Sequence, residues 1–456
     1  MNNELWNEFS RLPIDSPKLR QYQAEETRKL LLYVYENSPY YKAKFDKAGV
    51  NPYDFTCLEQ LADYPTFDKY EERESQAQSL KELNHPLGMH ITCDIRQVNR
   101  MSASSGTTGT PSFQGHTKND RQVIFKNMAR LMDMGGCKPG DKVLMAGVMS
   151  MWVAGIPTVD ALLDFGANVI PIGGLVGTAK VAEMIVLTRP DIIVCTPSFA
   201  LNLLQKSQAE YGIDLAAQGI SKICVYGEPG GSIPEIIQKL EAGFGGAKVF
   251  DMAGGTGALN PIFTSCTEQD GMHFIAPDEC VIELYDRETK KVLPWQDGAI
   301  GEFVYTGLHR ECGPLIRFMD GDLIQVNLKP CKCGYPGMRI KFVGRVDDML
   351  LVKGVNVFPT AIRDTVSSMG PVVTGNIRVV KPSASPVVEP PLHVKVETTG
   401  ELSAEQQAEL IDAISAKIQR QLRFKAKIEL FAQGSLVMEY GATGKVKLIE
   451  KAYQEE

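Results

Sequence analysis

The chain has 456 residues, of which 44% are hydrophobic and 23% are charged, and its formal net charge is −7. This length predicts more than one domain, the negative charge argues against nucleic-acid binding, and no apolar run reaches the roughly 20 residues that span a bilayer. The start, MNNELWNEFS, lacks the basic and then apolar layout of a signal peptide. Ten scattered cysteines fit a reducing compartment. We therefore expect a cytoplasmic protein that contacts neither membrane nor nucleic acid.

The first part of the chain is predicted to be mainly helical. Apolar positions recur at spacings of three and four over residues 19–41, and residues 63–85 are polar and rich in helix formers. A strand-like stretch, residues 95–104, leads into SASSGTTGTPSF, in which seven of twelve residues are Ser or Thr. An amphipathic helix then follows near Asn119 and ends at Gly135.

Residues 141–254 alternate short apolar runs with helical patterns. The expected strands are DKVLMAGV, ANVIPIG, PDIIVCT, SKICVYG and AKVFDMAG. The expected helices are GIPTVDALLDFG, TAKVAEMIVLTR, PSFALNLLQKSQAEYG and SIPEIIQKLEAGFG. Such alternation indicates an α/β fold with a mostly parallel sheet, and right-handed crossovers place the helices on its faces.

From Asp278 the pattern changes to alternating strands joined by turns that contain Gly and Asp. It predicts an antiparallel β subdomain. Beyond it come a strand, a helix over residues 360–369, two strands, a helix over residues 403–422 and a last pair of strands. We therefore predict a large N-terminal domain, residues 1–346, and a small mobile α+β C-terminal domain, residues 347–456.

The hydroxyl-rich loop has the chemistry of a phosphate-binding segment. Its glycines let the backbone turn tightly and expose N–H groups, and its Ser and Thr hydroxyls add further donors. It lacks the Gly-Lys-Ser/Thr ending of the Walker loop. The same composition is also typical of a mobile surface loop, so both interpretations stand on composition alone.

Five motifs in order resemble those of the adenylate-forming superfamily, the acyl-CoA synthetases and their relatives. SSGTTGTP resembles its phosphate loop, PLIRFMDGDL its ribose-binding segment, and GATGKVK the segment with the catalytic lysine. VYGEP, GRVDDMLLVKGVNVFP and the N-terminal NSPYYKAKFDKAGVNPYDF are similar to the phenylacetate–CoA ligase branch. The resemblance covers essentially the whole chain.

This resemblance implies a two-step ligation. A small-molecule carboxylic acid attacks the α-phosphate of ATP, which gives acyl-AMP and pyrophosphate, and a thiol then displaces AMP. The implied cofactors are ATP, Mg²⁺ and coenzyme A, the usual thiol. The oligomeric state stays open, and a homodimer is one possibility.

The resemblance also implies roles for individual residues. Lys445 would be catalytic, between the carboxylate and the α-phosphate. Asp322 would hold the ribose hydroxyls, Arg345 would reach the ribose or a phosphate, and Asp347 would be the hinge. The other nucleotide-binding residues would be Ser104, Ser105, Gly106, Thr107, Thr108, Gly109, Gly227, Glu228, Pro229, Asp251, Met252 and Thr256. Taken without the resemblance, such residues are ordinary in turns, surface ion pairs and solvated loops.

Two positions depart from the family pattern. The family usually carries a Mg²⁺-binding Glu in a segment Tyr-Gly-x-Ser/Thr-Glu, and here AGGTG puts Gly257 at that place. Glycine cannot ligate a metal, so either another ligand serves, phosphates and water hold Mg²⁺ alone, or adenylation is weakened. Thr110 stands where many relatives have Lys in the phosphate loop.

Three functions are therefore compared. The first is an acid–CoA ligase, and the second is an adenylating enzyme that loads the thiol of a separate carrier protein. The third is a nucleotide-binding relative with impaired catalysis, which Gly257 suggests. The presence of Lys445, Asp322 and Arg345 favours the two enzymes, and we expect the CoA ligase.

Cysteines and a histidine suggest a separate metal site. CKCG places Cys331 and Cys333 on one turn, and CTEQDGMH supplies Cys266 and His273. Three Cys and one His are a common ligand set of closed structural zinc sites, although C-x-C is tighter than the usual C-x₂-C. The alternative is four unrelated side chains. Two other thiols are equally available, Cys280 and Cys312.

The acid pocket is expected along AGVMSMWVAGIP, which follows a predicted strand. This segment offers Met149, Trp152 and Ile156, which are large and apolar, and Met adapts to irregular shapes. An aromatic or other compact hydrophobic acid would fit such a pocket. The alternative is that Trp152 and the methionines only pack a helix onto the sheet.

Overall fold

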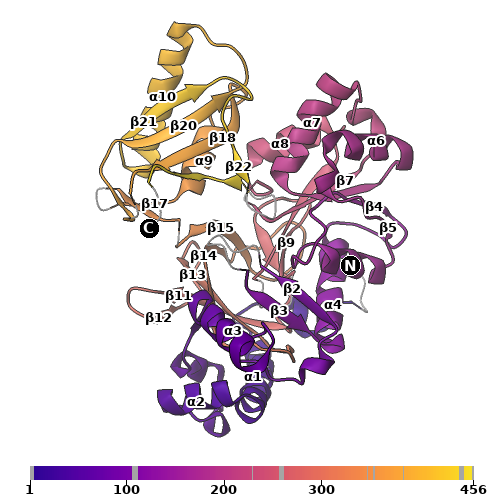
Figure 1. Ribbon diagram of the computed structural model, residues 1–456, viewed down its shortest axis with the longest axis vertical. Helices are drawn as coiled ribbons and strands as arrows, with labels where there is room; N and C mark the ends of the chain where they lie inside the picture. Colours follow the sequence, from indigo (N-terminus) through magenta and orange to yellow (C-terminus); the bar gives the residue numbers. More distant parts are fainter. Residues whose placement is uncertain are drawn as a thin grey trace.

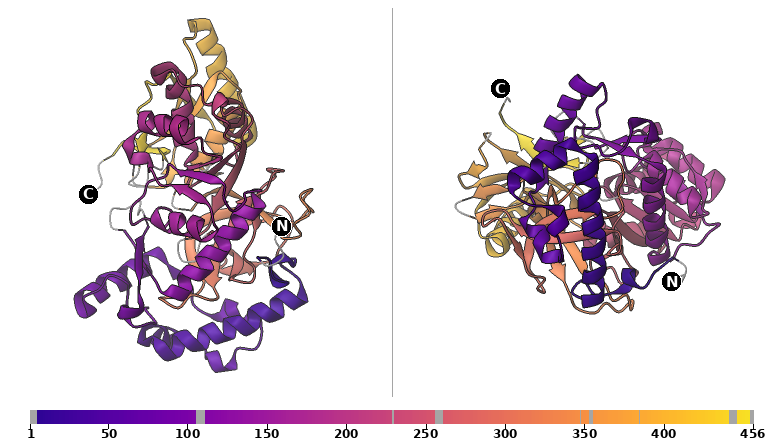
Figure 2. Two further views of the ribbon diagram at one scale, coloured as in Figure 1. Left: turned by 90° about the vertical axis from the view of Figure 1, so that its right-hand side faces the viewer. Right: turned by 90° about the horizontal axis from the view of Figure 1, so that it is seen from below.

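The computed structural model describes residues 5–104, 111–228, 230–255, 261–346, 348–352, 355–383, 385–440 and 446–453. Its fold is mixed α/β with a large sheet and a smaller α+β part at the C-terminal end, which confirms the predicted fold class. The N-terminal helices and this C-terminal part lie at opposite ends of the molecule (Figures 1 and 2). Within the described ranges, no helix is both long enough and apolar enough to cross a membrane.

Three helices form most of the N-terminal region: α1 (Pro17–Asn37), α2 (Pro39–Ala48) and α3 (Lys69–Leu83). The single helix predicted over residues 19–41 is wrong, because it breaks at Ser38. Ser38 has an extended backbone (φ −128°, ψ 109°), as the residue before a proline prefers. Pro39 then takes the first position of α2, where a missing N–H costs nothing.

The predicted parallel strands are confirmed. They are β4 (Lys142–Met145), β5 (Asn168–Ile170), β6 (Ile192–Cys195), β7 (Lys222–Tyr226) and β8 (Lys248–Ala253), and all their mutual pairings are parallel. The connecting helices are α5 (Ile156–Asp164), α6 (Thr178–Thr188), α7 (Pro197–Tyr211) and α8 (Pro234–Gly243). The ends of all four lie within two residues of their predicted patterns.

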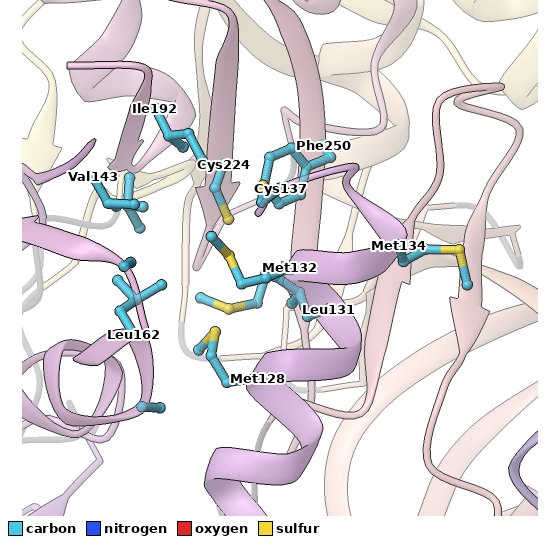
Figure 3. Packing of buried hydrophobic residues seen from close by; sticks show 14 of the residues in the cluster. Met128, Leu131, Met132, Met134, Cys137, Val143, Leu162, Ile192, Cys224 and Phe250 are labelled. Atoms are coloured by element: carbon cyan, nitrogen blue, oxygen red, sulfur yellow. The ribbon is translucent and has the colours of Figure 1, made fainter. Parts of the chain in front are cut away.

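Both faces of β4, β6, β7 and β8 are buried, whereas the edge strand β5 is partly exposed. Neighbouring residues such as Val143 and Leu144 belong to two different hydrophobic clusters, because alternate side chains point to opposite faces. Helix α4 (Lys118–Met134) covers one face with Met128, Leu131 and Met132 (Figure 3). Their spacing of three and four places them on one side of the helix. This explains why the strands read as continuous apolar runs.

The antiparallel strands do not form a separate sheet. They are β9 (Phe263–Ser265), β10 (Met272–Phe274), β11 (Cys280–Asp286), β12 (Lys291–Leu293), β13 (Ile300–Gly307), β14 (Phe318–Asn327) and β15 (Arg339–Arg345). Strand β8 pairs antiparallel with β9, with Met252 opposite Thr264. Parallel and antiparallel strands therefore share one sheet of 13 strands, which β1 (Phe67–Asp68) joins by pairing with β14.

The C-terminal part has its own sheets and core. It contains β16 (Leu350–Val352), β17 (Val355–Val357), α9 (Pro359–Ser367), β18 (Val373–Lys381), β19 (Val387–Val388), β20 (Leu392–Thr398), α10 (Ala404–Leu422), β21 (Ala426–Phe431), β22 (Glu439–Tyr440), β23 (Val446–Lys447) and β24 (Ile449–Lys451). It touches the larger part through polar contacts. Lys239 Nζ donates to the Val373 carbonyl at 3.0 Å, and the Thr360 hydroxyl donates to the Val343 carbonyl at 3.0 Å.

Candidate nucleotide site and cysteine–histidine cluster

The hydroxyl-rich loop is flanked by two short paired strands, β2 (Arg100–Ala103) and β3 (Phe113–His116). Ser104 N–H donates to the Ser112 carbonyl at 2.8 Å, and Ser112 N–H donates to Ser104 Oγ at 3.3 Å. These bonds close the base of the loop. Strand β3 was not predicted, because only four residues separate Ser112 from the helix cap at Thr117. The predicted phosphate ligands Ser105, Gly106, Thr107, Thr108 and Gly109 lie outside the described residues, as does Thr110.

The hairpin borders the segment expected to line the acid pocket. Ala103 N–H donates to the Met151 carbonyl at 2.8 Å, and Val153 N–H donates to the Ala103 carbonyl at 3.2 Å. Trp152 and Met149 are partly buried, and Met149 packs on the main core. Ile156 begins α5 with 44% of its surface exposed. The segment therefore lies beside the hairpin that flanks the hydroxyl-rich loop, and its contact with an acid stays a prediction.

The expected adenine side lies at the carboxyl ends of β7 and β8, where parallel α/β sheets commonly bind ligands. Gly227 and Glu228 follow β7, and Met252 in β8 pairs with Tyr226. Glu228 accepts hydrogen bonds from the backbone N–H of Ser198, at 3.2 Å, and from its hydroxyl. Two predicted members of this side lie outside the described residues, Pro229 and Thr256.

Asp251 is buried at this edge, with 6% of its surface exposed. Its carboxylate accepts from the Ser232 hydroxyl at 3.2 Å and from Met252 N–H at 2.9 Å. Gly231 permits this packing, since a Cβ there would lie 2.6 Å from the Asp251 carboxyl carbon. Burial raises the pKa of Asp251 to about 7. The carboxyl can therefore donate or accept a hydrogen bond near neutral pH.

The predicted ribose and phosphate residues meet across two strands. Asp322 on β14 pairs in register with Arg345 on β15, and Arg345 Nη1 lies 2.5 Å from Asp322 Oδ1. The second guanidinium nitrogen donates to the Asp320 carbonyl at 3.0 Å. Both paired side chains keep some exposure, 23% for Asp322 and 28% for Arg345. The structure thus brings together two residues that the motifs assigned to one site.

A close contact joins the adenine side to the antiparallel strands. A Cβ at Gly255, just after β8, would lie 2.2 Å from the ring of Tyr305 on β13. Tyr305 in turn pairs with Phe318 on β14, the strand that carries Asp322. Only glycine fits at position 255 without displacing this buried ring. The predicted catalytic residue Lys445 and the predicted hinge residue Asp347 lie outside the described residues.

The four predicted metal ligands form one cluster. The ligand atoms of Cys266, His273, Cys331 and Cys333 all lie within 4.8 Å of one another. Cys266 Sγ is 3.7 Å from Cys331 Sγ, and Cys333 Sγ is 3.4 Å from His273 Nε2. A tetrahedral zinc with its usual bond lengths separates two sulfurs by about 3.8 Å and a sulfur from a nitrogen by about 3.6 Å. The donor set and spacing therefore fit a closed zinc site.

The surroundings of the cluster are buried and aromatic. His273 is fully buried, and burial lowers its pKa to about 4, so its ring is neutral and keeps a lone pair at pH 7. Tyr335 N–H donates to Cys333 Sγ at 3.4 Å, and the Tyr335 ring lies 5.2 Å from His273 and 5.4 Å from Trp6. The other two candidate thiols are elsewhere. Cys280 lies in β11 and Cys312 lies beside Gly115.

Comparisons with known proteins cover most of the chain. Residues 354–449 match the family described as AMP-binding enzyme C-terminal domain. The chain is 34% identical over 351 residues to a phenylacetate–coenzyme A ligase of Pseudomonas putida, which covers 76% of this chain and 75% of that protein. It is 33% identical over 362 residues to that of Escherichia coli strain K12, with 78% of each chain covered.

Comparison with solved structures also finds acyl-CoA ligases. A 2-hydroxyisobutyryl-CoA ligase in the postadenylation state, in complex with 2-HIB-AMP, matches with a TM-score of 0.84 and 25% identity over 98% of this chain and 96% of that one. The same ligase in the thioesterification state, with 2-HIB-AMP and CoA, matches over the same shares with a TM-score of 0.65. Together with the sequence identities, these matches show that the chain belongs to the phenylacetate–CoA ligase family of the adenylate-forming superfamily.

Proposed function

We propose that this protein is an ATP-dependent acid–CoA ligase, which forms acyl-AMP and pyrophosphate and then transfers the acyl group to coenzyme A. The observation that carries the proposal is its similarity to phenylacetate–CoA ligases, at 32–34% identity over about three quarters of the chain. The pairing of Asp322 with Arg345 and the hydroxyl-rich hairpin supply matching chemistry.

In the first step a carboxylate must approach a triphosphate, so positive charge and aimed donors are needed where negative charge accumulates. The loop over residues 105–110 would hold the β- and γ-phosphates through N–H and hydroxyl groups. Asp322 would accept hydrogen bonds from the ribose hydroxyls, and Arg345, fixed beside it, would place its charge near the ribose or a phosphate. Lys445 would bridge the carboxylate and the α-phosphate.

Mg²⁺ would accompany the nucleotide without a dedicated protein cage. Gly257 offers no ligand, and the two carboxyls described at this edge are already engaged, Glu228 with Ser198 and Asp251 with Ser232. Mg²⁺ commonly keeps several waters and relies on substrate phosphates. We therefore expect ATP and water to supply most of its ligands, and the metal would neutralise charge on the phosphates.

The second step requires the C-terminal part to move. Lys445 would occupy the side from which the thiol approaches, so residues 347–456 would rotate about Asp347 between the steps. The higher TM-score with the postadenylation structure than with the thioesterification structure of one ligase supports this, because those two structures differ in state. In this interpretation the described arrangement corresponds to the state after adenylation.

The acid is expected to be aromatic or compact and hydrophobic, because Met149 and Trp152 are large and apolar and Trp152 forms a bridge with Ala103 of the loop hairpin. A pyrophosphate-release screen over such acids, with ATP and with or without coenzyme A, tests the function. We expect release with at least one acid and a CoA thioester as the product. Release without any CoA thioester would favour a carrier-protein thiol, and no release with any acid would favour the impaired nucleotide-binding relative.

We also propose that Cys266, His273, Cys331 and Cys333 bind a structural zinc ion. The distances between their ligand atoms support four-coordination with no open position. Elemental analysis of protein purified without chelator should find about one zinc per chain. A content well under one would count decisively against the site. A cytoplasmic location and a homodimer stay predictions.

A further inference from the structure

Helix α3 buries a polar face. Its residues Lys69, Glu72 and Gln76 are spaced by three and four, which places them on one side of the helix. Glu72 and Gln76 are only 2% and 6% exposed. Buried polar groups nearly always have hydrogen-bond partners, because leaving one unpaired is costly. The hydrogen-bond and ion-pair partners of this face therefore show which segments the helix holds in place.

Gln76 holds the strand that leaves the hydroxyl-rich loop. Its side-chain Nε2 donates to the Phe113 carbonyl at 2.7 Å, and Phe113 N–H donates to Gln76 Oε1 at 2.9 Å. Phe113 is the first residue of β3, and it pairs with Ala103 of β2 on its other side. A single side-chain amide thus satisfies both backbone groups of Phe113, as a neighbouring strand would.

Glu72 holds the residues on either side of Phe113. Gln114 Nε2 donates to Glu72 Oε1, and the Ser112 hydroxyl also bonds this carboxyl. Gln114 is fixed from the opposite side by Arg310, which donates to its Oε1. Residues 112–114, which come shortly after the loop, therefore contact two consecutive turns of α3.

The first turn of α3 holds the ribose strand. Lys69 Nζ lies 2.5 Å from Asp320 Oδ1, and Phe67, just before the helix, pairs with Phe318 of β14. Asp320 precedes Asp322 by two residues, and its carbonyl accepts a bond from Arg345. One helix thus contacts both the base of the phosphate loop and the strand that carries the ribose carboxylate.

We propose that α3 sets the spacing between the phosphate loop and the ribose strand, and that Gln76 is a positioning residue for the triphosphate of ATP. The inference rests on the proposed function, since it takes the loop as the phosphate site. A misplacement of about 1 Å can cost on the order of a hundredfold in rate. Gln76 acts through Phe113 and touches no substrate, so its effect should depend on the part of the nucleotide that the loop contacts.

The test compares the affinity of ATP with that of AMP, because AMP lacks the two phosphates assigned to the loop. Gln76→Met keeps the side-chain length but removes both hydrogen bonds to Phe113. We expect this variant to bind ATP at least about tenfold more weakly than the wild type and AMP within about twofold, measured by calorimetry. Gln78→Met is the matched control, since Gln78 is exposed on the same helix and should change neither affinity.

A second variant guards against a folding defect. Lys69→Met alters the ribose side, and Lys69 keeps 28% exposure, so the fold should tolerate the change. It should weaken ATP and AMP by a similar factor. Equal losses for both nucleotides in Gln76→Met, or none, would overturn the inference, and so would a Lys69→Met variant that weakens ATP alone. Failure of the proposed function is a separate result, namely no pyrophosphate release by the wild type.

Discussion

The metal cluster and the nucleotide site are built in different ways. In the cluster, the ligand atoms of Cys266, just after β9, of His273 in β10 and of two cysteines on one turn lie within 4.8 Å of one another. All four residues belong to the larger part of the molecule. In the nucleotide site, the described side chains bond to the protein itself, as Asp322 does with Arg345 and Asp251 with Ser232. Its expected lysine belongs to the C-terminal part. The difference suggests that the cluster supports the fold, whereas the nucleotide site is completed only by movement.

Replacing one cysteine of the cluster should have the largest effect of the changes considered, and the quantity that changes should be the stability of the protein. We expect Cys331→Ser to lose zinc and to unfold more easily, by about 4 kcal/mol at a free zinc concentration a thousand times Kd. Thermal unfolding and elemental analysis measure both changes. Trp6 should report the loss by its fluorescence, because the ring of Tyr335 contacts both Trp6 and His273.

The control is Cys57→Ser, which alters an exposed thiol outside the cluster. It should keep the zinc and the unfolding temperature of the wild type. A Cys331→Ser protein with unchanged zinc content and unchanged stability would contradict the structural role of the cluster. A loss of zinc without any loss of stability would show that the ion does not support the fold.

Replacing Lys445, the lysine that we propose to be catalytic, should leave stability unchanged and should affect the two steps of the reaction differently. We expect Lys445→Ala to slow acyl-AMP formation by about a hundredfold to a thousandfold, the usual cost of losing one group that stabilises transition-state charge. Thioester formation from supplied acyl-AMP should be spared. Rapid-quench measurements of each half-reaction check this. Equal slowing of both half-reactions would mean that Lys445 does not act in the first step alone.

The complementary variant is Asp347→Pro, which fixes φ at about −65° at the proposed hinge. It should slow thioester formation more than adenylation, the reverse of the lysine variant. If Lys445→Ala slows mainly adenylation and Asp347→Pro slows mainly thioester formation, the C-terminal part moves between the two steps. Such movement would distinguish the nucleotide site from the cluster. A proline variant with both rates unchanged would place the hinge elsewhere.

A smaller effect is expected at the ribose. Asp322→Ala removes a carboxylate that would accept charge-assisted hydrogen bonds, each worth roughly 1.5–3 kcal/mol. ATP and AMP should therefore both bind roughly tenfold to a hundredfold more weakly in titrations, with the zinc content unchanged. Asp54→Ala, an exposed site on the surface, is the control. An unchanged affinity for AMP would remove Asp322 from the ribose site.

Local patterns predicted the elements well and their assembly less well. The helices α6, α7 and α8 follow from apolar periodicity, and the break at Ser38 could have been predicted from Pro39 alone. The pairing of β8 with β9 could not, because the hydrogen bonds between two strands leave no mark on the sequence pattern of either strand. The continuous sheet was therefore missed, although both halves of it were expected.

The sites show the same contrast. The cysteine–histidine cluster could be predicted because few residue types bind zinc, so only the Cys and His residues of the sequence had to be considered as ligands. Glu72 and Gln76 were missed because a buried polar face has the same sequence pattern as a solvated one. A buried polar face differs from a solvated one only in its burial, which the sequence does not give.

The smallest expected effect concerns the pH dependence of stability, and it comes from Glu72. Burial raises the pKa of this carboxyl from its ordinary 4.5 to about 7, against the lowering effect of Ser112, Arg310 and Gln114; Asp320 raises it further. Between these values the folded state binds more protons than the unfolded state. The contribution of Glu72 to stability is therefore full below about pH 4.5 and is lost as the pH rises through about 7. The slope from one such group is at most about 1.4 kcal/mol per pH unit.

Glu72→Gln cannot ionise, so urea unfolding between about pH 5 and about pH 8 should show a shallower fall in stability than the wild type. Asp251, whose pKa is also raised to about 7, should keep part of the slope, and Asp251→Asn should remove that part. Glu82→Gln, exposed on the same helix, should follow the wild type. A Glu72→Gln curve parallel to the wild-type curve would mean that this carboxyl titrates alike in both states, and that the buried face of α3 is held by an ionised group.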